Sequence, residues 1–279
     1  MLGRAVCDWL AREGRAHHVP AHANLDLRDE ASIRAGIPMG TGTVINCAGW
    51  TNVDGAEANE QEATLINGTA VGHLAAHCKS VGAVLVHYST DYVFAGQGSE
   101  PYPVDHPRAP LNAYGRSKAA GEVLLAQSGA EHLLLRTSWV YAPWGKNFVR
   151  TIVGLAKQRS SLKVVSDQLG RPSSAEQIAR VTLELLRGGG RGVYHVSDRG
   201  QCTWFEFAAE AIALAGLDCR VEPCTSAEFP SPAVRPGYSV LDLSRTEAKV
   251  GLLTPWQTSL ADVVRRLDAA PPSTSGAGR

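Results

Sequence analysis

Tyr114 and Lys118 are four residues apart in the segment YGRSK, a spacing that places two side chains on the same face of a helix. A free phenol has a pKa of about 10, and an ammonium beside it favours the phenolate and lowers that pKa toward the working range. The hydroxyl of Thr90, or that of Ser89, could hold a carbonyl oxygen against the phenol. Such a site protonates an alkoxide as a hydride arrives, or runs the reverse reaction. A Tyr and a Lys at this spacing also occur by chance on surface helices, so the pair needs support from its surroundings.

Short apolar runs alternate with amphipathic stretches around these residues, and this alternation predicts the elements that position them. The pattern predicts buried strands over 43–48, 83–88 and 133–137, and helices over 57–78 and 113–126. It is typical of an α/β fold with a Rossmann-like, doubly wound parallel sheet. In such sheets, ligands bind outside the carboxyl ends of the strands. Thr90 and the segment 48–51 both lie at such ends.

The pattern loosens after residue 140, where helices are expected over 147–157, 175–186 and 204–215. We therefore divide the chain into three parts. Residues 1–140 form a dinucleotide-binding domain, 141–268 form a smaller, mixed and mainly substrate-binding portion, and 269–279 form a tail without bulky apolar residues that we expect to be disordered.

Composition excludes several classes of protein. Of 279 residues, 44% are hydrophobic, enough for a large core, and 27 Lys and Arg balance 27 Asp and Glu. This balance argues against a nucleic-acid surface or a polybasic membrane patch, and no apolar run approaches a membrane span. The 6 cysteines include no CxxC pair and are typical of reduced thiols in a cytoplasmic protein. His73 and His77 share a helical face, as two metal ligands could, but no third ligand is evident, so we predict no catalytic metal.

Seven sequence blocks occur in the order in which they occur in one known family. They include STDYVF at 89–94 and NAYGRSK at 112–118, and the others lie at 46–57, 136–141, 147–148, 167–173 and 235–239. On these blocks the chain resembles the dTDP-4-dehydrorhamnose reductases, a family of the extended short-chain dehydrogenase/reductase superfamily. Each block alone is a weak signal, whereas the ordered set spans nearly the whole chain.

The resemblance implies an enzyme that uses NADPH or NADH to reduce the 4-keto group of a dTDP-linked 6-deoxyhexose, dTDP-4-dehydrorhamnose, to give dTDP-L-rhamnose. It implies that Tyr114 gives the proton, that Lys118 lowers the pKa of Tyr114 and grips the nicotinamide ribose, and that Thr90 orients the carbonyl. The remaining residues that it assigns to the cofactor are Met1, Leu2, Gly3, Asp26, Leu27, Ala48, Gly49, Trp50 and Thr51. Those that it assigns to the substrate, besides Thr90, are Asp91, Trp139, Asn147, Gln168 and Arg235. The dTDP-linked keto-deoxysugar is the expected partner, and a homodimer is the assembly that we consider.

Several of these assignments compete with structural roles. Trp139 could be a core aromatic residue, and Asn147, Gln168 and Arg235 could serve only as hydrogen-bonding groups in loops. Asp26 could cap a helix that starts near Asp29 instead of touching the adenine. An Arg that could meet the 2′-phosphate of NADP often stands four residues before this Asp in the family. The residue here is His22, which leaves the choice between NADPH and NADH open.

The resemblance also reveals one departure. The family begins with a strand and a Gly-rich turn, and Met1, Leu2 and Gly3 match the last three positions of that turn. The first strand and two glycines that let the backbone approach a pyrophosphate have no counterpart in the chain as written. We therefore expect the 279-residue chain to fold poorly and to bind dinucleotide weakly, with a true start upstream.

Two other functions fit the same residues. One is a related deoxysugar 4-ketoreductase, such as a dihydrostreptose synthase. The other is a non-catalytic regulatory subunit, because the beta subunit of methionine adenosyltransferase resembles this family as well. The presence of Thr90, Tyr114 and Lys118 favours an enzyme over a regulatory subunit.

Overall fold

A four-stranded parallel sheet forms the centre of the larger part of the molecule. The structure is a computed structural model and describes residues 1–21 and 25–267. The strands lie in the order β1 (Thr43–Asn46), β2 (Val84–Thr90), β3 (His132–Thr137) and β8 (Gly192–His195), and every pair is parallel. Their carboxyl ends therefore meet at one edge of the sheet, where Thr90 pairs with Thr137.

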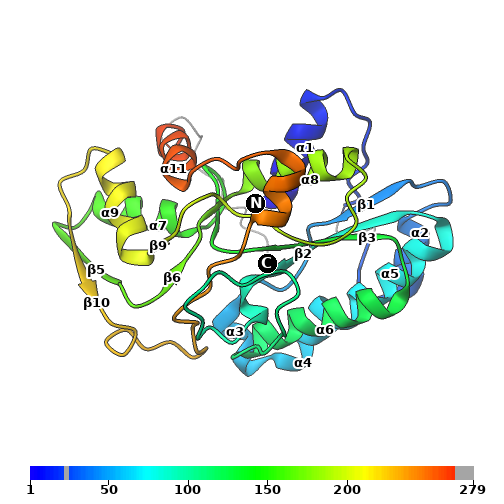
Figure 1. Cartoon of the computed structure of the whole chain (residues 1–279), viewed down its shortest axis with the longest axis horizontal. Coiled ribbons are helices and arrows are strands. Elements are labelled where there is room, and N and C mark those ends of the chain that lie inside the picture. The colour runs from blue at the N-terminus through cyan, green and yellow to red at the C-terminus, as the bar shows by residue number, and fades with distance from the viewer. Residues whose placement is uncertain (22–24, 268–279) are drawn as a thin grey trace.

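Helices cover both faces of this sheet (Figure 1). On one face, α2 (Glu30–Gly36), α5 (Ala70–Val81) and α6 (Ala113–Ser128) pack around Leu85 and Leu134. On the other face, α8 (Ala175–Arg187) packs against Val86, Leu133 and Leu135, and α1 (Leu2–Arg12) packs on α8. Successive residues of a strand point to opposite faces, so a sheet covered on both sides needs continuous apolar runs. The predicted Rossmann-like, doubly wound α/β fold is confirmed.

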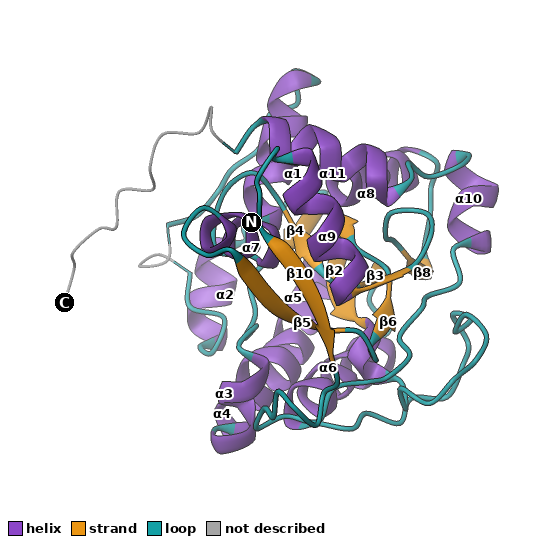
Figure 2. Cartoon of the chain, turned by 90° about the vertical axis from the view of Figure 1, so that its left-hand side faces the viewer, coloured by secondary structure: helices purple, strands orange, loops and turns teal. Residues whose placement is uncertain are grey.

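A smaller part lies beside the sheet and carries its own core. Two parallel strands, β5 (Ser161–Val165) and β10 (Arg220–Cys224), face the viewer in Figure 2. Three helices surround them: α7 (Phe148–Ala156), α9 (Trp204–Leu214) and α11 (Trp256–Arg265). Phe207 joins the three helices, because it lies in one apolar cluster with Val149 and Leu260. The remaining elements are α10 (Ser244–Val250) and the short strand pairs β4 (Val140–Tyr141) with β7 (Ser173–Ser174) and β6 (Leu169–Gly170) with β9 (Cys202–Thr203).

The packing does not follow a single cut at residue 140. Helix α8 and strand β8 come after that residue in the chain, yet α8 covers the sheet and β8 is one of its strands. The smaller part is therefore built from chain segments on both sides of α8 and β8. The predicted tail over 269–279 lies outside the described residues.

The long helix predicted over 57–78 is interrupted twice. Helix α3 (Val53–Ala58) ends at Asn59, whose backbone leaves the helical region and whose side-chain amide donates to the Gly55 carbonyl at 2.8 Å. Helix α4 (Glu60–Thr64) then runs through a π-helical turn, η2 (Leu65–Thr69), into α5. A π-turn of this kind marks a functional position in many helices. Here it carries Asn67, whose contacts belong to the site.

The buried strand predicted over 43–48 is present, but it is shorter and more exposed than predicted. Strand β1 ends at Asn46, and only Asn46 is buried along it. Within the described residues β1 pairs with β2 alone and so forms one edge of the sheet. Strand β2, by contrast, extends beyond the predicted range to Thr90 and is buried along almost its whole length.

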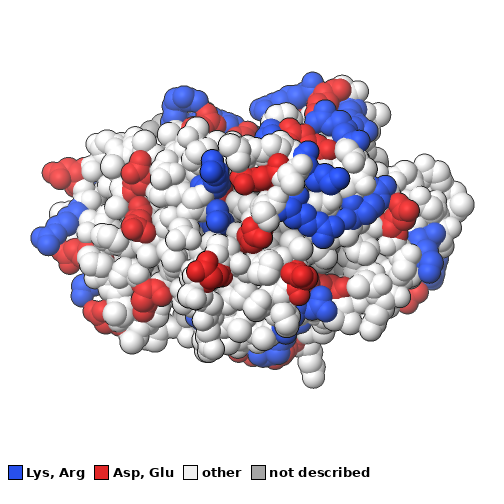
Figure 3. Space-filling view, in the orientation of Figure 1, with Lys and Arg blue, Asp and Glu red and all other residues white. Residues whose placement is uncertain are grey.

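Acidic and basic side chains are interspersed over the face of the molecule seen in Figure 3, in keeping with a formal net charge of zero. No helix among the described residues is both long enough and apolar enough to cross a bilayer.

Candidate active site at the carboxyl edge of the sheet

Thr90 is the last residue of β2 and caps the short helix η3 (Asp91–Val93). Its hydroxyl accepts the Tyr92 N–H at 3.2 Å and donates to Asp91 Oδ1 at 2.9 Å. Both Thr90 and Asp91 are buried. Burial raises the pKa of Asp91 to about 6, although hydrogen bonds from the Ser239 and Thr90 hydroxyls act in the opposite direction. Hydrogen bonds to Asp91 and Tyr92 therefore fix the Thr90 hydroxyl at the carboxyl end of β2.

Tyr114 lies in the first turn of α6, which begins after Asn112. The Asn112 side chain accepts the Gly115 N–H at 2.8 Å and so caps the helix. A Cβ at Gly115 would overlap the Tyr92 carbonyl oxygen, so only glycine lets α6 approach η3 this closely. The approach places the Tyr114 phenol where the Thr90 hydroxyl acts to lower its pKa. Burial and the charge of Asp91 outweigh this effect, so the pKa of Tyr114 lies above its ordinary value.

Lys118 follows one turn later on α6 and is also buried. Its ammonium donates to the Tyr88 carbonyl at 2.6 Å and lies 3.4 Å from His87 Nε2. Burial lowers the pKa of Lys118 to about 8, while Glu122 raises it. Lys118 is not among the groups that shift the pKa of Tyr114 in this structure, so its effect on that pKa stays a prediction. The two side chains share a helix face, but the ammonium is bound to β2, and burial and Asp91 set the pKa of the phenol.

The segment 48–51 follows β1 and lies next to Tyr114. Trp50 packs on the same apolar cluster as Tyr114, and its backbone N–H and carbonyl both bind the Asn67 side chain, at 2.9 and 3.0 Å. Asn67 also donates to the Ser117 hydroxyl at 3.0 Å. A Cβ at Gly49 would lie only 3.0 Å from Asn67 Oδ1. The π-turn thus ties Gly49 and Trp50 to the helix that carries Tyr114 and Lys118, and Ala48 and Thr51 lie in the same loop.

Trp139 lies two residues beyond the carboxyl end of β3. Its backbone is in the left-handed region at φ 46°, which few non-glycine residues adopt. Its indole stacks on Trp204 with ring centroids 3.6 Å apart. A Cβ at Gly170 would meet the Trp139 ring at 2.7 Å and the Ser239 hydroxyl at 3.0 Å. Trp139 is therefore adjacent to Ser239, whose hydroxyl acts to lower the pKa of Asp91. A strained backbone of this kind is frequent at functional sites.

Arg235 reaches the site from a loop near the C-terminus. Its guanidinium lies 2.8 Å from Asp54 Oδ2. Burial raises the pKa of Tyr92 to about 12, and Arg235 acts in the opposite direction. The Tyr92 ring packs edge-on against Tyr114 at 5.9 Å. Gln168 is buried and donates to the Ser226 hydroxyl at 2.9 Å, so its amide is already bonded within the loops.

Asn147 is not turned toward the other predicted substrate residues. Its carbonyl caps α7 by accepting the Arg150 N–H at 3.2 Å, and its amide donates to the Ala142 carbonyl at 2.9 Å. These contacts favour the structural role for Asn147. It also lies 3.5 Å from the sulfur of Met1, beside the start of α1.

The predicted cofactor residues 1–3 form the N-terminal end of α1. Leu2 packs against the sheet and α8, and a Cβ at Gly3 would contact Cys47, the residue after β1, at 3.4 Å. The first turn of α1 contains no acidic residue, and Met1 makes no side-chain cap. This end therefore faces the carboxyl end of β1, near Ala48.

Asp26 and Leu27 lie farther away, before α2. The Asp26 carboxylate holds the Arg28 guanidinium at 2.7 Å, and Leu27 packs partly buried against the core around α2 and α5. The cap of α2 is Asp29, which accepts the Ala31 N–H at 2.9 Å, so Asp26 is not the capping residue. His22 lies outside the described residues.

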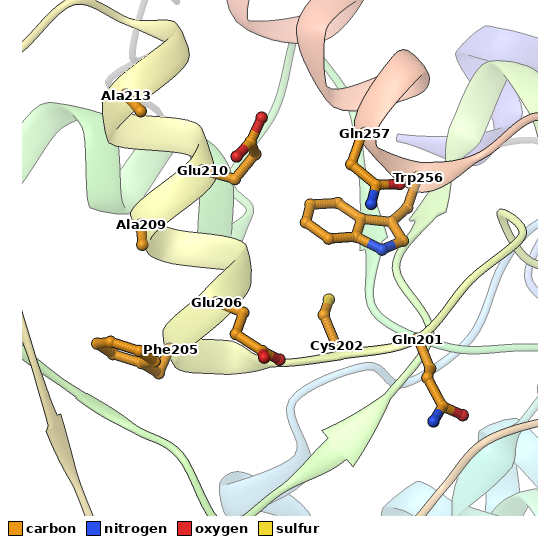
Figure 4. Close-up of a pocket in the computed structure, with 9 residues that line it drawn as sticks. All are labelled: Gln201, Cys202, Phe205, Glu206, Ala209, Glu210, Ala213, Trp256 and Gln257. Atoms are coloured by element: carbon orange, nitrogen blue, oxygen red, sulfur yellow. The ribbon is translucent and has the colours of Figure 1, made fainter.

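Two other features do not join this site. His77 Nε2 donates to the Ile37 carbonyl at 2.8 Å, and His73 lies 3.3 Å from Glu30, so both contact the neighbouring α2 region. A separate pocket opens between α9 and α11, lined by residues that include Cys202, Glu206 and Trp256 (Figure 4). Its Glu206 is used in the capping box of α9, and burial raises the pKa of the Cys202 thiol. No predicted site residue lines that pocket.

Sequence reasoning missed several residues that hold the site. Tyr92 and Asn67 gave no isolated signal, because their contacts arise from the approach of η3 and the π-turn to α6. Asn46 and His87 did give one, since each is a polar residue within a predicted buried strand. Both are buried and bonded to each other at 3.1 Å.

A doubly wound sheet with Thr90, Tyr114 and Lys118 gathered at its carboxyl edge is the arrangement of the extended short-chain dehydrogenase/reductases. Within that class the chain belongs to the family described as the RmlD substrate binding domain, whose model matches residues 1–269.

Named relatives support this membership. The chain is 40% identical over 272 residues to a dTDP-4-dehydrorhamnose reductase of Streptomyces griseus, covering 94% of this chain and 89% of the relative. It is 39% identical over 277 residues to a dTDP-4-keto-6-deoxy-D-glucose reductase of Streptomyces niveus, covering 96% of this chain and 95% of the relative. Among solved structures, dTDP-4-dehydrorhamnose reductase from Bacillus anthracis in complex with NADP superposes with a TM-score of 0.88 at 33% identity, covering 96% of this chain and 95% of that chain.

Proposed function

We propose that the protein is a reductase that uses NADPH or NADH to convert dTDP-4-dehydrorhamnose to dTDP-L-rhamnose. The observation that carries the proposal is the placement of the Tyr114 phenol beside the buried Thr90 hydroxyl at the end of β2, where Thr90 acts to lower the pKa of the phenol. Its relatives' names support the substrate, and the solved relative with NADP supports the cofactor.

The residues around the end of β1 fit a dinucleotide. Gly49 has no side chain, and the room for one is already limited by Asn67. The uncapped first turn of α1 leaves backbone N–H groups for a pyrophosphate, as helix N-termini do in dinucleotide-binding folds. We assign Met1, Leu2, Gly3 and the loop 48–51 to this contact, and Asp26 and Leu27 to the adenosine side.

A bound nicotinamide would supply the hydride to the 4-keto carbon. The proton then has to reach the sugar oxygen, and Tyr114 is the donor. Because the pKa of Tyr114 lies above its ordinary value, the phenol carries its proton at neutral pH. An alkoxide is a stronger base than a phenolate, so transfer from Tyr114 to the sugar oxygen is downhill.

Thr90 orients the carbonyl oxygen toward Tyr114. Its hydroxyl proton is donated to Asp91 in the structure, so a carbonyl oxygen that takes this proton displaces Asp91 as the acceptor. The pKa of Asp91, about 6, means that this carboxyl gains a proton under mildly acidic conditions. We therefore assign Asp91 to the sugar together with Thr90.

Lys118 is assigned to the nicotinamide ribose and to proton supply for Tyr114, because its amine lies one helical turn from the phenol. Trp139 is assigned to the sugar, and Arg235 and Gln168 to the diphosphate, for which a guanidinium and an amide suit the oxygens. We leave Asn147 out of the proposed contacts, because its side chain caps α7 and binds a loop carbonyl.

A direct assay tests this function. The purified protein would be mixed with dTDP-4-dehydrorhamnose and either NADPH or NADH, and the loss of reduced-nicotinamide absorbance would be followed. We expect turnover, and we expect Tyr114→Phe to lose it while retaining cofactor binding measured by fluorescence. Absence of turnover with both cofactors would contradict the proposal.

A second substrate belongs in the same assay, because the Streptomyces niveus relative is nearly as similar as the Streptomyces griseus one. Turnover of dTDP-4-keto-6-deoxy-D-glucose in preference to dTDP-4-dehydrorhamnose would favour a related deoxysugar ketoreductase. Cofactor binding without turnover of either sugar would favour the regulatory subunit.

A further inference from the structure

His87 lies in the middle of β2, directly beneath the catalytic residues, and is 1% exposed. It is a polar residue within an otherwise apolar stretch of strand, between Val86 and Tyr88. Its two ring nitrogens each have one partner. Nδ1 lies 3.1 Å from the Asn46 amide nitrogen, and Nε2 lies 3.4 Å from the Lys118 amine.

The orientation of Asn46 decides which ring nitrogen carries hydrogen. Asn46 Oδ1 accepts the Ala48 N–H at 3.0 Å, so the other arm of the side chain is its NH₂ group. An NH₂ group only donates, and it points at His87 Nδ1. Nδ1 must therefore offer its lone pair, and a neutral imidazole then carries its hydrogen on Nε2.

This tautomer directs an N–H at the Lys118 amine. A protonated lysine has three donors and no acceptor, whereas a neutral amine has a lone pair that accepts a hydrogen bond. The Tyr88 carbonyl takes one N–H of the amine at 2.6 Å, and either form of the amine can make that bond. The His87 contact therefore separates the two forms, and it favours the neutral one.

Other charged groups around Lys118 are engaged elsewhere. On α6, Glu122 binds Arg136 from β3 at 2.7 Å and Arg108 at 3.1 Å, although it still favours the charged amine. The remaining groups that face α6 from α3, α4 and η3 also have partners. Glu57 accepts the Ala113 N–H, Glu60 binds Arg116, Asp91 accepts from Thr90, and Arg235 acts to lower the pKa of Tyr92. His87 is thus the titratable group in direct contact with the amine, and its own pKa is held well below the usual range by burial and by Lys118.

We propose that His87, with its tautomer fixed by Asn46, is a positioning residue that favours the neutral amine of Lys118. This inference rests on the proposed function, in which Lys118 supplies the proton that Tyr114 gives away. In this role the ammonium gives a proton to the Tyr114 phenolate, and the neutral amine that is left takes a proton from water. An environment that favours the neutral amine makes the first of these transfers easier. Asn46 and His87 thereby adjust the amine without touching the substrate.

The tautomer can be measured on the full chain without substrate. Nitrogen-15 spectra of histidine-labelled protein distinguish a ring nitrogen that carries hydrogen from one that does not, and His87→Phe identifies the signals. We expect His87 to be neutral at pH 7 with hydrogen on Nε2. A charged ring, or hydrogen on Nδ1, would overturn the proposal without any further variant.

Asn46→Asp tests the link to Lys118. A carboxylate at position 46 accepts from Nδ1, so the hydrogen moves to Nδ1 and the lone pair of Nε2 then accepts from the charged amine. The pKa of Lys118, followed by the carbon-13 shift of its Cε atom, should rise by about one unit or more. The alkaline limb of the pH–rate profile should move in the same direction. Gln127→Glu is the control, because it adds a carboxylate to the exposed end of α6 without touching His87, and it should leave the Lys118 titration in place.

The outcomes separate this inference from the proposed function. A Lys118 titration that is the same in Asn46→Asp and in the native chain, or that Gln127→Glu moves equally, would overturn the role of His87. An inert enzyme whose spectra show the expected tautomer and shift would instead contradict only the proposed reaction, because these measurements need no turnover.

Discussion

Asp91→Asn should change the pH dependence of folding stability. Asp91 is 2% exposed, and burial raises its pKa to about 6 from an ordinary value near 3.9. Between these two values the folded chain holds a proton on Asp91 that the unfolded chain has lost. Stability from this group therefore falls as the pH rises through that window and is fully lost above about pH 6. At about 1.4 kcal/mol per pKa unit, the loss is roughly 3 kcal/mol.

Asparagine keeps an acceptor for the Thr90 hydroxyl and does not titrate. The free energy of unfolding of Asp91→Asn, relative to the native chain, should therefore rise by roughly 2 kcal/mol between pH 4.5 and pH 7, which is the part of the loss that falls within that range. Urea unfolding at a series of pH values measures it, provided that the transition is reversible and the slope is the same for both proteins. Comparing the two proteins removes the contribution of other groups, including the buried Asp198, whose pKa is also raised, to about 7.

Two results would refute this reasoning. A stability difference that stays constant with pH would show that Asp91 has the same pKa in the folded and unfolded chains. A difference that falls with rising pH would show that the hydroxyls of Thr90 and Ser239 stabilise the carboxylate more than burial disfavours it.

Three further changes address the catalytic geometry. Tyr114→Phe should lower kcat by about 10²–10⁴-fold. Tyr92→Phe removes the hydroxyl from the neighbouring ring, 5.9 Å away, and should not lower kcat in this way. Equal losses of kcat in steady-state assays of the two variants would contradict the assignment of Tyr114. Gly115→Ala should lower both the midpoint of thermal unfolding and kcat, because the new methyl group overlaps the Tyr92 carbonyl, and a variant as stable and active as the native chain would show that η3 yields easily. Trp204→Leu should raise KM for the sugar nucleotide more than it lowers kcat, since it removes the ring stacked on Trp139 at 3.6 Å, and an unchanged KM would exclude Trp139 from substrate binding.

Sequence patterns located the central strands and their helices because these elements bury continuous or periodic apolar residues. Successive apolar residues in the runs around Leu85 and Leu134 pack against helices on opposite faces of the sheet. A continuous apolar run of this kind is needed only in a sheet that is covered on both faces. The same reasoning did not predict β5, because this strand alternates exposed and buried residues and has no continuous apolar run. It failed again within 57–78. There Asn59 ends one helix, and Asn67 lies in a π-turn and binds Trp50, which is distant in the sequence.

The candidate site divides in a similar way. Thr90 and Tyr114 could be found because strand ends and helix spacing are local properties, and the structure places both at the carboxyl edge of the sheet. Their electrostatics could not be found, because burial dominates the pKa values and depends on the whole fold. Tyr114 lies four residues from Lys118 in the sequence, but burial and the charge of Asp91 raise the pKa of its phenol. Asn147, which resembles a phosphate contact by residue type, is used instead to cap α7.

The raised pKa of Tyr114 favours the phenol, which is the form that reduction requires. Burial raises the pKa of Tyr114, so the phenol keeps its proton. Burial lowers the pKa of Lys118, so the ammonium loses its proton more easily. Both effects follow from removing charged forms from water. Oxidation of an alcohol would need Tyr114 as a phenolate, which this environment disfavours, whereas reduction needs a phenol that gives up its proton only to a stronger base. The same burial that makes Tyr114 a poor acid in the resting enzyme therefore reserves its proton for the alkoxide formed at the sugar.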